Sequence, residues 1–169
     1  MRVPCLVRWT NRIPAGTVCD EVTTVMDWLP TFAGLAGGKP PTDRIIDGHD
    51  IWPLLSGQPG ATSPYDAFYY YHLDQLQAVR SGKWKLYLDP DSKRSDLTDE
   101  SESGDLRLYN LESDLREATD IADRHPRIVE RLSLLAEQAR VDLGDMSREG
   151  AHRRPVGHVQ DPRPQQLPR

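Results

Sequence analysis

The stretch Gln75–Leu88 constrains the fold more than any other part of the chain, because two short apolar runs meet there at Ser81-Gly82. This pattern predicts a β-hairpin with Ser81 and Gly82 as its loop. In that register both faces carry apolar side chains, with Val79, Trp84 and Leu86 on one face and Leu76, Ala78 and Tyr87 on the other. A hairpin with one solvated face would alternate apolar and polar residues. We therefore expect another layer to cover each face.

A helix after Pro126 is the strongest candidate for such a layer. Its apolar residues recur at the helical period, and they are Ile128, Val129, Leu132, Leu135, Ala136, Ala139 and Leu143. Pro126 suits the first turn of a helix, Asp123 is the predicted N-cap, and Gly144 ends the pattern. This helix is expected to cover one face of the hairpin.

Two further strands extend the predicted sheet. Ala67–Leu73 is dense in aromatic residues and leads into the hairpin, and Leu106–Leu111 alternates in polarity. The predicted fold class is α+β, with a small antiparallel sheet packed by a C-terminal helix.

The first 60 residues follow a different pattern. Val3–Trp9 is a β-prone apolar run, and residues 20–37 have the helical period. Pro30 either kinks that helix or lies in its first turn. Residues 47–57 are expected to form a turn followed by a short helix that carries Ile51, Leu54 and Leu55, with Pro53 in its first turn.

Changes in composition divide the chain into three predicted parts. Residues 1–60 form the first, residues 61–146 a small α+β subdomain, and residues 147–169 an extended basic, proline-rich tail. Within the subdomain, the polar and acidic residues 89–104 predict a mobile loop.

The bulk composition excludes some classes of function. The net charge of −5 and the pI near 5.5 argue against a general nucleic-acid binder. The sequence contains no run of 18 apolar residues, so no membrane span is predicted. The start does not resemble a signal peptide, and the sequence does not identify the compartment. A mean hydropathy of −0.63 and 14 prolines are unfavourable for a self-sufficient core.

Several motifs, in this order along the chain, resemble the C-terminal portion of sulfatases of the arylsulfatase type. They are the opening MRVPCLVRW, IPAGT at 13–17, MDWLPTFAGLAG at 26–37, DGHDIWPLLSG at 47–57, FYYY at 68–71, AVRSGKWKL at 78–86 and LYNL at 108–111. The chain departs from this pattern at Asp114-Leu115, where many relatives have Asp-Pro before the glutamate that matches Glu117.

The resemblance implies that the full enzyme hydrolyses sulfate esters. In this family a cysteine in a C-x-P-S-R motif becomes formylglycine, and carboxylates and an amide hold calcium or a similar divalent cation. Neither Cys5 nor Cys19 lies in such a motif, and we expect both to be ordinary thiols. The chain is therefore interpreted as the C-terminal portion of a sulfatase. Its first part would be the final strand and helices of a truncated α/β sulfatase domain, and the small α+β subdomain would follow.

Such a portion would be inactive alone and would need the missing N-terminal sulfatase domain as its partner. It would support that domain and supply one wall of the cleft for the sulfate ester substrate. Full-length relatives are often exported or lysosomal.

His72 and Asp74 are the candidate substrate-binding residues, because the resemblance places the end of this strand near the cleft. An imidazole near neutrality can donate a hydrogen bond to a sulfate oxygen. The alternative for His72 is a packing histidine at an interface.

Other polar clusters have simpler explanations. His49 with Asp47 and Asp50 resembles a metal cluster, but a turn with an N-cap at a helix start explains it better. Lys83 and Lys85 fit a solvated strand edge. Arg153-Arg154 are expected to bind an acidic partner or to cover part of the large domain.

Two other functions remain open from the sequence. One is a stand-alone α+β interaction module. The other is a fragment of a phosphonate or phosphodiester hydrolase, because the superfamily fold also serves phosphoryl transfer.

Overall fold

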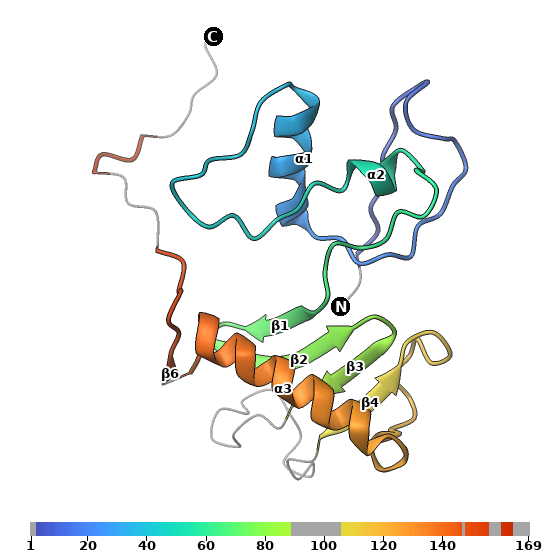
Figure 1. The fold of residues 1–169 in the computed structure, drawn as a ribbon, viewed down its shortest axis with the longest axis vertical. Helices are drawn as coiled ribbons and strands as arrows, with labels where there is room; N and C mark the ends of the chain where they lie inside the picture. The colour runs from blue at the N-terminus through green and yellow to red at the C-terminus, as the bar shows by residue number, and fades with distance from the viewer. Residues whose placement is uncertain (1–2, 89–105, 147, 156–159, 164–169) are drawn as a thin grey trace.

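The computed structural model describes residues 3–88, 106–146, 148–155 and 160–163. It contains two units, which we call the helical unit (residues 3–60) and the sheet unit (residues 61–155). Figure 1 shows the helices α1 and α2 of the helical unit above the sheet and α3 of the sheet unit. No helix in the described part is both long and apolar enough to cross a membrane.

The first helix begins later than the periodicity over residues 20–37 predicted. A 3₁₀ turn, η1 (Val25–Asp27), leads directly into α1 (Trp28–Leu35). Thr24 sets this start, because its side chain caps the turn while its backbone N–H donates to the Asp27 carboxylate. Residues 20–24 are therefore not helical.

Proline lies in the first turn of both α-helices of the helical unit. Pro30 is the third residue of α1 and is buried, so the first-turn alternative is confirmed and no kink is needed. Pro53 occupies the first turn of α2 (Trp52–Leu55), as predicted. Gly37 follows α1 with a φ of +75°, a conformation that favours glycine.

Residues 3–9 do not form the strand that their composition predicted. They are exposed and belong to no sheet in the described part of the chain. A strand requires backbone hydrogen bonds from a neighbouring strand, and β-propensity alone does not supply one. This part of the prediction is wrong for the chain as it stands.

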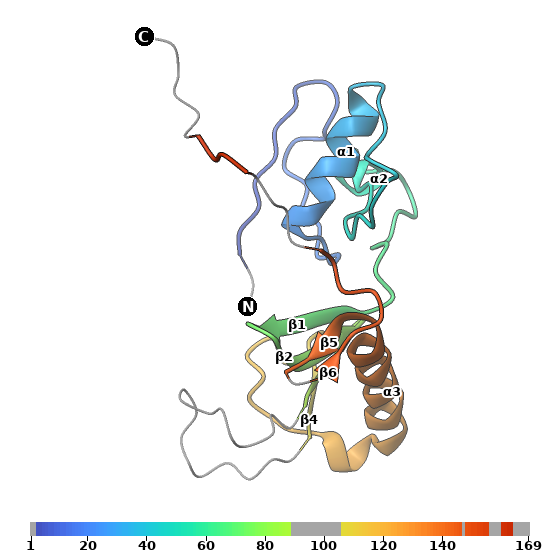
Figure 2. The same cartoon turned by 90° about the vertical axis from the view of Figure 1, so that its left-hand side faces the viewer.

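The sheet unit has the predicted architecture. Four antiparallel strands lie in the order β1 (Phe68–His72), β2 (Gln75–Ser81), β3 (Trp84–Tyr87) and β4 (Arg107–Asn110). The helix α3 (Pro126–Leu143) lies across one face of this sheet, as Figure 2 shows. The α+β fold class, with a C-terminal helix on a small antiparallel sheet, is confirmed.

The central hairpin turns one residue later than predicted. Gly82 and Lys83 form its loop, so that Val79 faces Leu86 instead of Trp84. Gly82 has a φ of +55° at the first loop position, where a type II′ turn requires a glycine. Each residue of β2 therefore pairs with a β3 residue two positions later than predicted. Because a shift of two residues keeps every side chain on its face, Val79, Trp84 and Leu86 remain on one face.

A bulge changes the face of one predicted core residue. The register of β1 and β2 shifts between Tyr70 and Tyr71, where β2 carries one extra residue. Leu76 therefore points to the same side as Val79 and joins the core under α3, whereas plain alternation predicted opposite faces.

The core of the sheet unit lies between α3 and this face of the sheet. Its buried residues are Leu76, Val79, Leu86, Leu88, Leu108, Leu132, Ala136 and Ala139. His125 is the N-cap of α3, so the prediction of Asp123 is wrong. Asp123 lies instead in a 3₁₀ turn, η3 (Ala122–Arg124), which precedes the helix.

The other face of the sheet is built around a buried lysine. Lys85 is 3% exposed, and its Nζ donates to both carboxylate oxygens of Glu117 at 2.8 and 2.9 Å. It also donates to the Tyr87 hydroxyl at 2.8 Å and lies 4.9 Å from the centre of the Tyr70 ring. The predicted solvated edge for Lys85 is therefore wrong, because β3 is a central strand.

Chain reversal after α3 forms a second, smaller sheet. Gly144 has a φ of +95° and ends the helix, as predicted. β5 (Gly144–Asp145) then pairs with β6 (Arg148–Glu149). The two residues of β6, which the prediction placed in the extended tail, therefore belong to a sheet. The predicted mobile loop at 89–104 lies outside the described residues.

Candidate functional site at the β1–β2 turn

His72 and Asp74 lie at the tight turn between β1 and β2. His72 pairs with Gln75, which leaves Leu73 and Asp74 as the two loop residues. Leu73 has a φ of +55° and is 78% exposed, so an apolar side chain is held outward in a conformation that is unusual for leucine. All three residues from His72 to Asp74 are exposed.

The segment after α3 fixes this turn. The backbone N–H of Met146 donates to the carbonyl oxygen of Asp74 at 2.7 Å. The N–H of Leu76 donates to Oδ1 of Asp145 at 3.0 Å, and Nε of Arg140 donates to Oδ2 of the same carboxylate at 2.8 Å. The turn is thus anchored from β5, with the Asp145 charge balanced by an arginine of α3.

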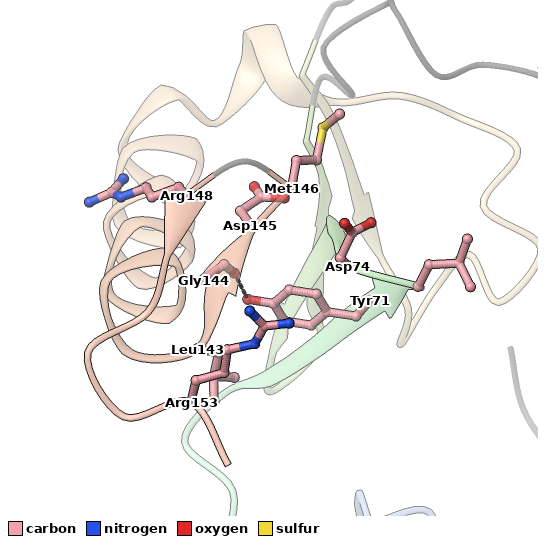
Figure 3. A pocket seen from close by; sticks show the side chains of 9 residues that line it. Tyr71, Asp74, Leu143, Gly144, Asp145, Met146, Arg148 and Arg153 are labelled. Carbon is pink, nitrogen blue, oxygen red and sulfur yellow. Dashed lines mark hydrogen bonds between the residues drawn. The ribbon is translucent and has the colours of Figure 1, made fainter. Parts of the chain in front are cut away.

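A surface hollow of about 270 Å³ opens between the turn and β5. Figure 3 shows side chains around it from both segments, among them Tyr71, Asp74, Asp145, Met146, Arg148 and Arg153. The structure therefore places Asp74 on the wall of this hollow. His72, the preceding strand residue, is not among the residues that line it.

Tyr71 acts as an anchor in this wall. Its hydroxyl donates to the carbonyl oxygen of Gly144 at 2.9 Å (Figure 3). Burial, together with the nearby Asp145 charge, raises the pKa of Tyr71 to about 12. The phenol therefore stays protonated near neutral pH and serves as a hydrogen-bond donor.

The chemistry available in the hollow is that of binding. Arg148 and Arg153 offer guanidinium donors, and Asp74 offers a carboxylate. No serine, cysteine or histidine is among the described residues that line it, so it presents no nucleophile of those types. Both cysteines, Cys5 and Cys19, are exposed free thiols in the helical unit.

The Asp47-Gly-His-Asp loop is a structural element. Gly48 packs against η1 so closely that an added Cβ would lie 2.0 Å from the Met26 carbonyl oxygen. The N–H of His49 donates to Asp27 at 2.9 Å, and the N–H of Trp52 donates to Asp50 at 2.9 Å. The interpretation as a turn that caps a helix is confirmed, although Ile51 rather than Asp50 is the formal N-cap.

The buried carboxylate of Asp27 holds this loop. It accepts hydrogen bonds from the backbone N–H groups of Thr24 and His49 and from the Tyr65 hydroxyl. Burial, and then the hydrogen bond to Asp27, raise the pKa of Tyr65 to about 12. Both carboxylate oxygens of Asp27 therefore accept hydrogen bonds from groups of the protein itself.

The described residues do not fit the cation and the formylglycine that sulfatases use. They contain no group of three or more histidine, cysteine or acidic side chains arranged to hold a metal ion. Cys5 is followed by Leu-Val-Arg and Cys19 by Asp-Glu-Val, neither of which matches C-x-P-S-R.

Sequence reasoning missed some residues at this site. Tyr71, Asp145 and Arg148 line the hollow with Asp74, and only the fold brings them there. The available signal was Gly144, because a glycine at the end of a helix predicts a chain reversal. Such a reversal would carry the following residues back toward the sheet.

Comparison with known proteins identifies the family. A model of the family described as N-sulphoglucosamine sulphohydrolase, C-terminal, matches residues 1–138. The chain is 45% identical over 91 residues to the steryl-sulfatase of Mus musculus, a match that covers 52% of this chain and 14% of that protein. It is 42% identical over 94 residues to the arylsulfatase of Hemicentrotus pulcherrimus, which covers 56% of this chain and 16% of that protein.

Solved structures agree on the fold. A structure from glycosaminoglycan metabolism by Bacteroides thetaiotaomicron aligns with a TM-score of 0.54 at 24% identity, over 68% of this chain and 24% of that chain. Ps i-CgsB aligns with a TM-score of 0.57 at 21% identity, over 77% of this chain and 27% of that chain.

The match thus covers about one sixth of the length of these sulfatases. The family model spans both the helical unit and most of the sheet unit, including β1 to β4. The chain belongs to the sulfatase family whose description is N-sulphoglucosamine sulphohydrolase, C-terminal.

Proposed function

We propose that this chain is the C-terminal part of a sulfuric ester hydrolase of the arylsulfatase type, which works with an N-terminal sulfatase domain. The observation that carries the proposal is the family match over residues 1–138, together with relatives that are sulfatases. In this role the chain supports the catalytic domain and supplies one wall of the substrate cleft.

The turn between β1 and β2 is the proposed wall. Asp74 lines the hollow beside Arg148 and Arg153, so ionic and hydroxyl groups of a sulfated substrate would find donors and an acceptor there. His72 is proposed as a second substrate contact. It is exposed at the end of β1 and free to approach a ligand held outside the hollow.

The exposed apolar surface of the helical unit supports the need for a partner domain. Val25 is 81% exposed, Leu29 51% and Phe32 57%, and their spacing places them along one side of η1 and α1. Burial of a large apolar side chain contributes roughly 1.5–3 kcal/mol. A catalytic domain that covers this side would recover that free energy.

The catalytic step is assigned to the partner domain, because neither cysteine lies in a C-x-P-S-R motif and the residues that the structure describes do not form a cation site. Calcium or a similar ion and the modified cysteine are expected in that domain. This chain would then contribute substrate binding without taking part in the attack on sulfur.

Assays on two forms of the protein test the proposal. The chain alone is expected to hydrolyse 4-nitrophenyl sulfate no faster than a heat-inactivated control. A longer form, which includes any upstream coding sequence with an in-frame C-x-P-S-R motif, is expected to show turnover. Turnover by the chain alone would contradict the proposal, and so would an upstream sequence that encodes an unrelated domain.

Asp74→Asn in the longer form tests the wall itself. Loss of a charged hydrogen-bond acceptor is expected to raise KM about tenfold with kcat nearly unchanged. Glu112→Gln is a matched control, because Glu112 is an exposed acid paired with Lys83 at the hairpin loop. Equal KM values for the two variants would show that the Asp74 carboxylate does not bind the substrate.

A further inference from the structure

The segment after β5 leads from the sheet unit back to the helical unit. We call residues 148–155 the C-terminal strap; it lies outside residues 1–138, which the family model matches. Figures 1 and 2 show it running from β6, beside the end of α3, toward the helical unit. The family match therefore does not extend to this connection.

The strap is fixed to the end of α3 by backbone hydrogen bonds. The N–H of Ala151 donates to the carbonyl oxygen of Val141, and the N–H of His152 donates to that of Asp142, both at 2.8 Å. These bonds satisfy carbonyl groups that a helix leaves without partners in its last turn. Gly150 permits the close approach, because an added Cβ would lie 2.2 Å from the carbonyl carbon of Leu143.

Arg154 then reaches the helical unit. Its Nε lies 3.2 and 3.1 Å from the two carboxylate oxygens of Asp47, and its Nη2 lies 2.5 Å from Oδ1. Its Nη1 lies 3.6 Å from Oδ2 of Asp142, the residue whose other oxygen contacts His152 Nδ1 at 2.7 Å. The Arg154 guanidinium thus joins Asp47, which lies 107 positions earlier in the sequence, to the end of α3.

We propose that Arg154 is a positioning residue that clasps the Asp47-Gly-His-Asp loop to the end of α3. The same α3–β5 region holds the β1–β2 turn, through the bond from Met146 N–H to the carbonyl oxygen of Asp74. The clasp thereby sets how the helical unit lies relative to that turn. This inference does not depend on the proposed enzymatic role.

The geometry indicates a local effect. The Arg154 side chain is 28% exposed and that of Asp47 38% exposed, and ion pairs of this kind add little to global stability. The loop also has a separate anchor in Asp27, so it stays folded when the clasp is broken. Breaking the clasp is expected to increase local opening of the loop and the strap.

Hydrogen exchange of the full chain, followed by mass spectrometry, tests this inference. The N–H groups of His49 and Ile51 are useful reporters, because they donate to Asp27 at 2.9 Å and to Thr31 at 3.0 Å. In Arg154→Ala, peptides that contain these amides are expected to exchange roughly two- to fivefold faster, with α3 unchanged. Arg153→Ala is the matched control, because this neighbouring arginine lines the hollow beside β5 and, among the residues that the structure describes, forms no ion pair with Asp47.

A charge swap separates the clasp from other roles of the two residues. Asp47→Arg alone is expected to exchange as fast as Arg154→Ala, and the double variant Asp47→Arg/Arg154→Asp to return toward the wild-type rate. Equal exchange in Arg154→Ala and Arg153→Ala would overturn the inference. It would also be overturned by acceleration that includes α3 to the same extent, or by failure of the swap to restore slow exchange.

Discussion

The helical unit and the sheet unit bury different kinds of side chain. The sheet unit closes an aliphatic core between α3 and the sheet, with Val79, Leu86, Leu108 and Leu132 each fully buried. In the helical unit the fully buried side chains include Asp27 and Thr31, and the buried apolar residues among those described there are Pro30 and Ile51. One unit is held by apolar packing and the other by hydrogen bonds to a few buried polar groups.

The exposed surfaces differ in the opposite sense. Large hydrophobic side chains that remain exposed in the helical unit are Val3, Leu6, Val7, Trp9, Val18, Val25, Met26, Leu29, Phe32 and Ile45. In the sheet unit such residues are scattered, as single exposed apolar residues commonly are. The comparison indicates that the sheet unit is close to self-sufficient, whereas the helical unit presents an apolar surface suited to a further domain.

The largest expected effect concerns the aliphatic core. Leu132→Ala is expected to lower the free energy of unfolding of the sheet unit by about 2–5 kcal/mol, because Leu132 is fully buried under α3. Leu134→Ala, on the same helix but 61% exposed, is expected to cost less than about 0.5 kcal/mol. Urea titration monitored by far-UV circular dichroism compares the two, and equal costs would show that this core is not what stabilises the unit.

The buried ion pair is the next most sensitive feature. Glu117→Gln leaves the positive charge of Lys85 buried without its carboxylate partner. We expect this to lower the free energy of unfolding by about 3 kcal/mol. Glu112→Gln breaks an exposed pair with Lys83 and should cost less than about 1 kcal/mol. Denaturant midpoints of the two variants would distinguish a structural pair from a surface one.

The same pair gives the sheet unit a predictable pH dependence. Burial acts to raise the pKa of Glu117, but the hydrogen bonds from Lys85 and Tyr87 outweigh it, so the net pKa is lowered. A lowered carboxyl pKa adds stability above the unfolded value near 4.5, and this stability is lost as the pH falls through the folded value. Between pH 7 and pH 3 the Tm of the wild type, measured by thermal unfolding, should therefore fall more steeply than that of Glu117→Gln.

At high pH the lysine partner gives the opposite trend. Burial acts to lower the pKa of Lys85, but hydrogen bonds with Glu117 and Tyr87 raise it above its usual 10.5. The stability that this group adds is present below pH 10.5 and is lost as the pH rises through the folded value. Between these limits the pair should stabilise the unit at constant strength.

Asp27 tests the polar anchoring of the helical unit. Asp27→Asn keeps the shape but weakens its hydrogen bonds with Thr24, His49 and Tyr65, so a local loss of about 1–3 kcal/mol is expected. Asp43→Asn is the control, because Asp43 is exposed and paired with the adjacent Arg44. Faster hydrogen exchange at residues 48–52 in Asp27→Asn alone would support polar anchoring, and unchanged exchange would count against it.

The smallest effect on stability is expected at the apolar surface of α1. Phe32→Ser should change the free energy of unfolding by less than about 0.5 kcal/mol, because Phe32 is 57% exposed. It should nevertheless reduce the self-association that we expect of the isolated chain at tens of micromolar. Light scattering measures this, with Leu134→Ser as the control; a wild-type chain that is already a monodisperse monomer would refute the expectation.

Local sequence signals predicted most elements of the sheet unit. The aromatic run of β1, the alternation of β4 and the 3.6-residue period of α3 each lead to an element close to its observed bounds. Gly144 also marked the end of α3 correctly, and Pro53 and Pro126 marked the first turns of α2 and α3. These signals depend on a few neighbouring residues, so they can be read without knowing the tertiary fold.

The candidate site was predictable only in part. The sequence suggested Asp74 and His72 as substrate contacts, which stays a prediction; Asp74 lines the hollow, whereas His72 does not. The partners of Asp74 come from β5 and from the strap, about 70 positions later, and no local pattern encodes such a meeting.

The sequence by itself determined the kind and order of the elements and the family to which the chain belongs, because periodicity, turn residues and motifs are local properties. Tertiary structure decided which residues face inward: the bulge that turns Leu76 to the core, the burial of Lys85 under Glu117, and the contact of Arg154 with Asp47. Each of these depends on segments distant in the chain meeting at hydrogen-bonding distance, and burial then fixes the energetic role of the side chain.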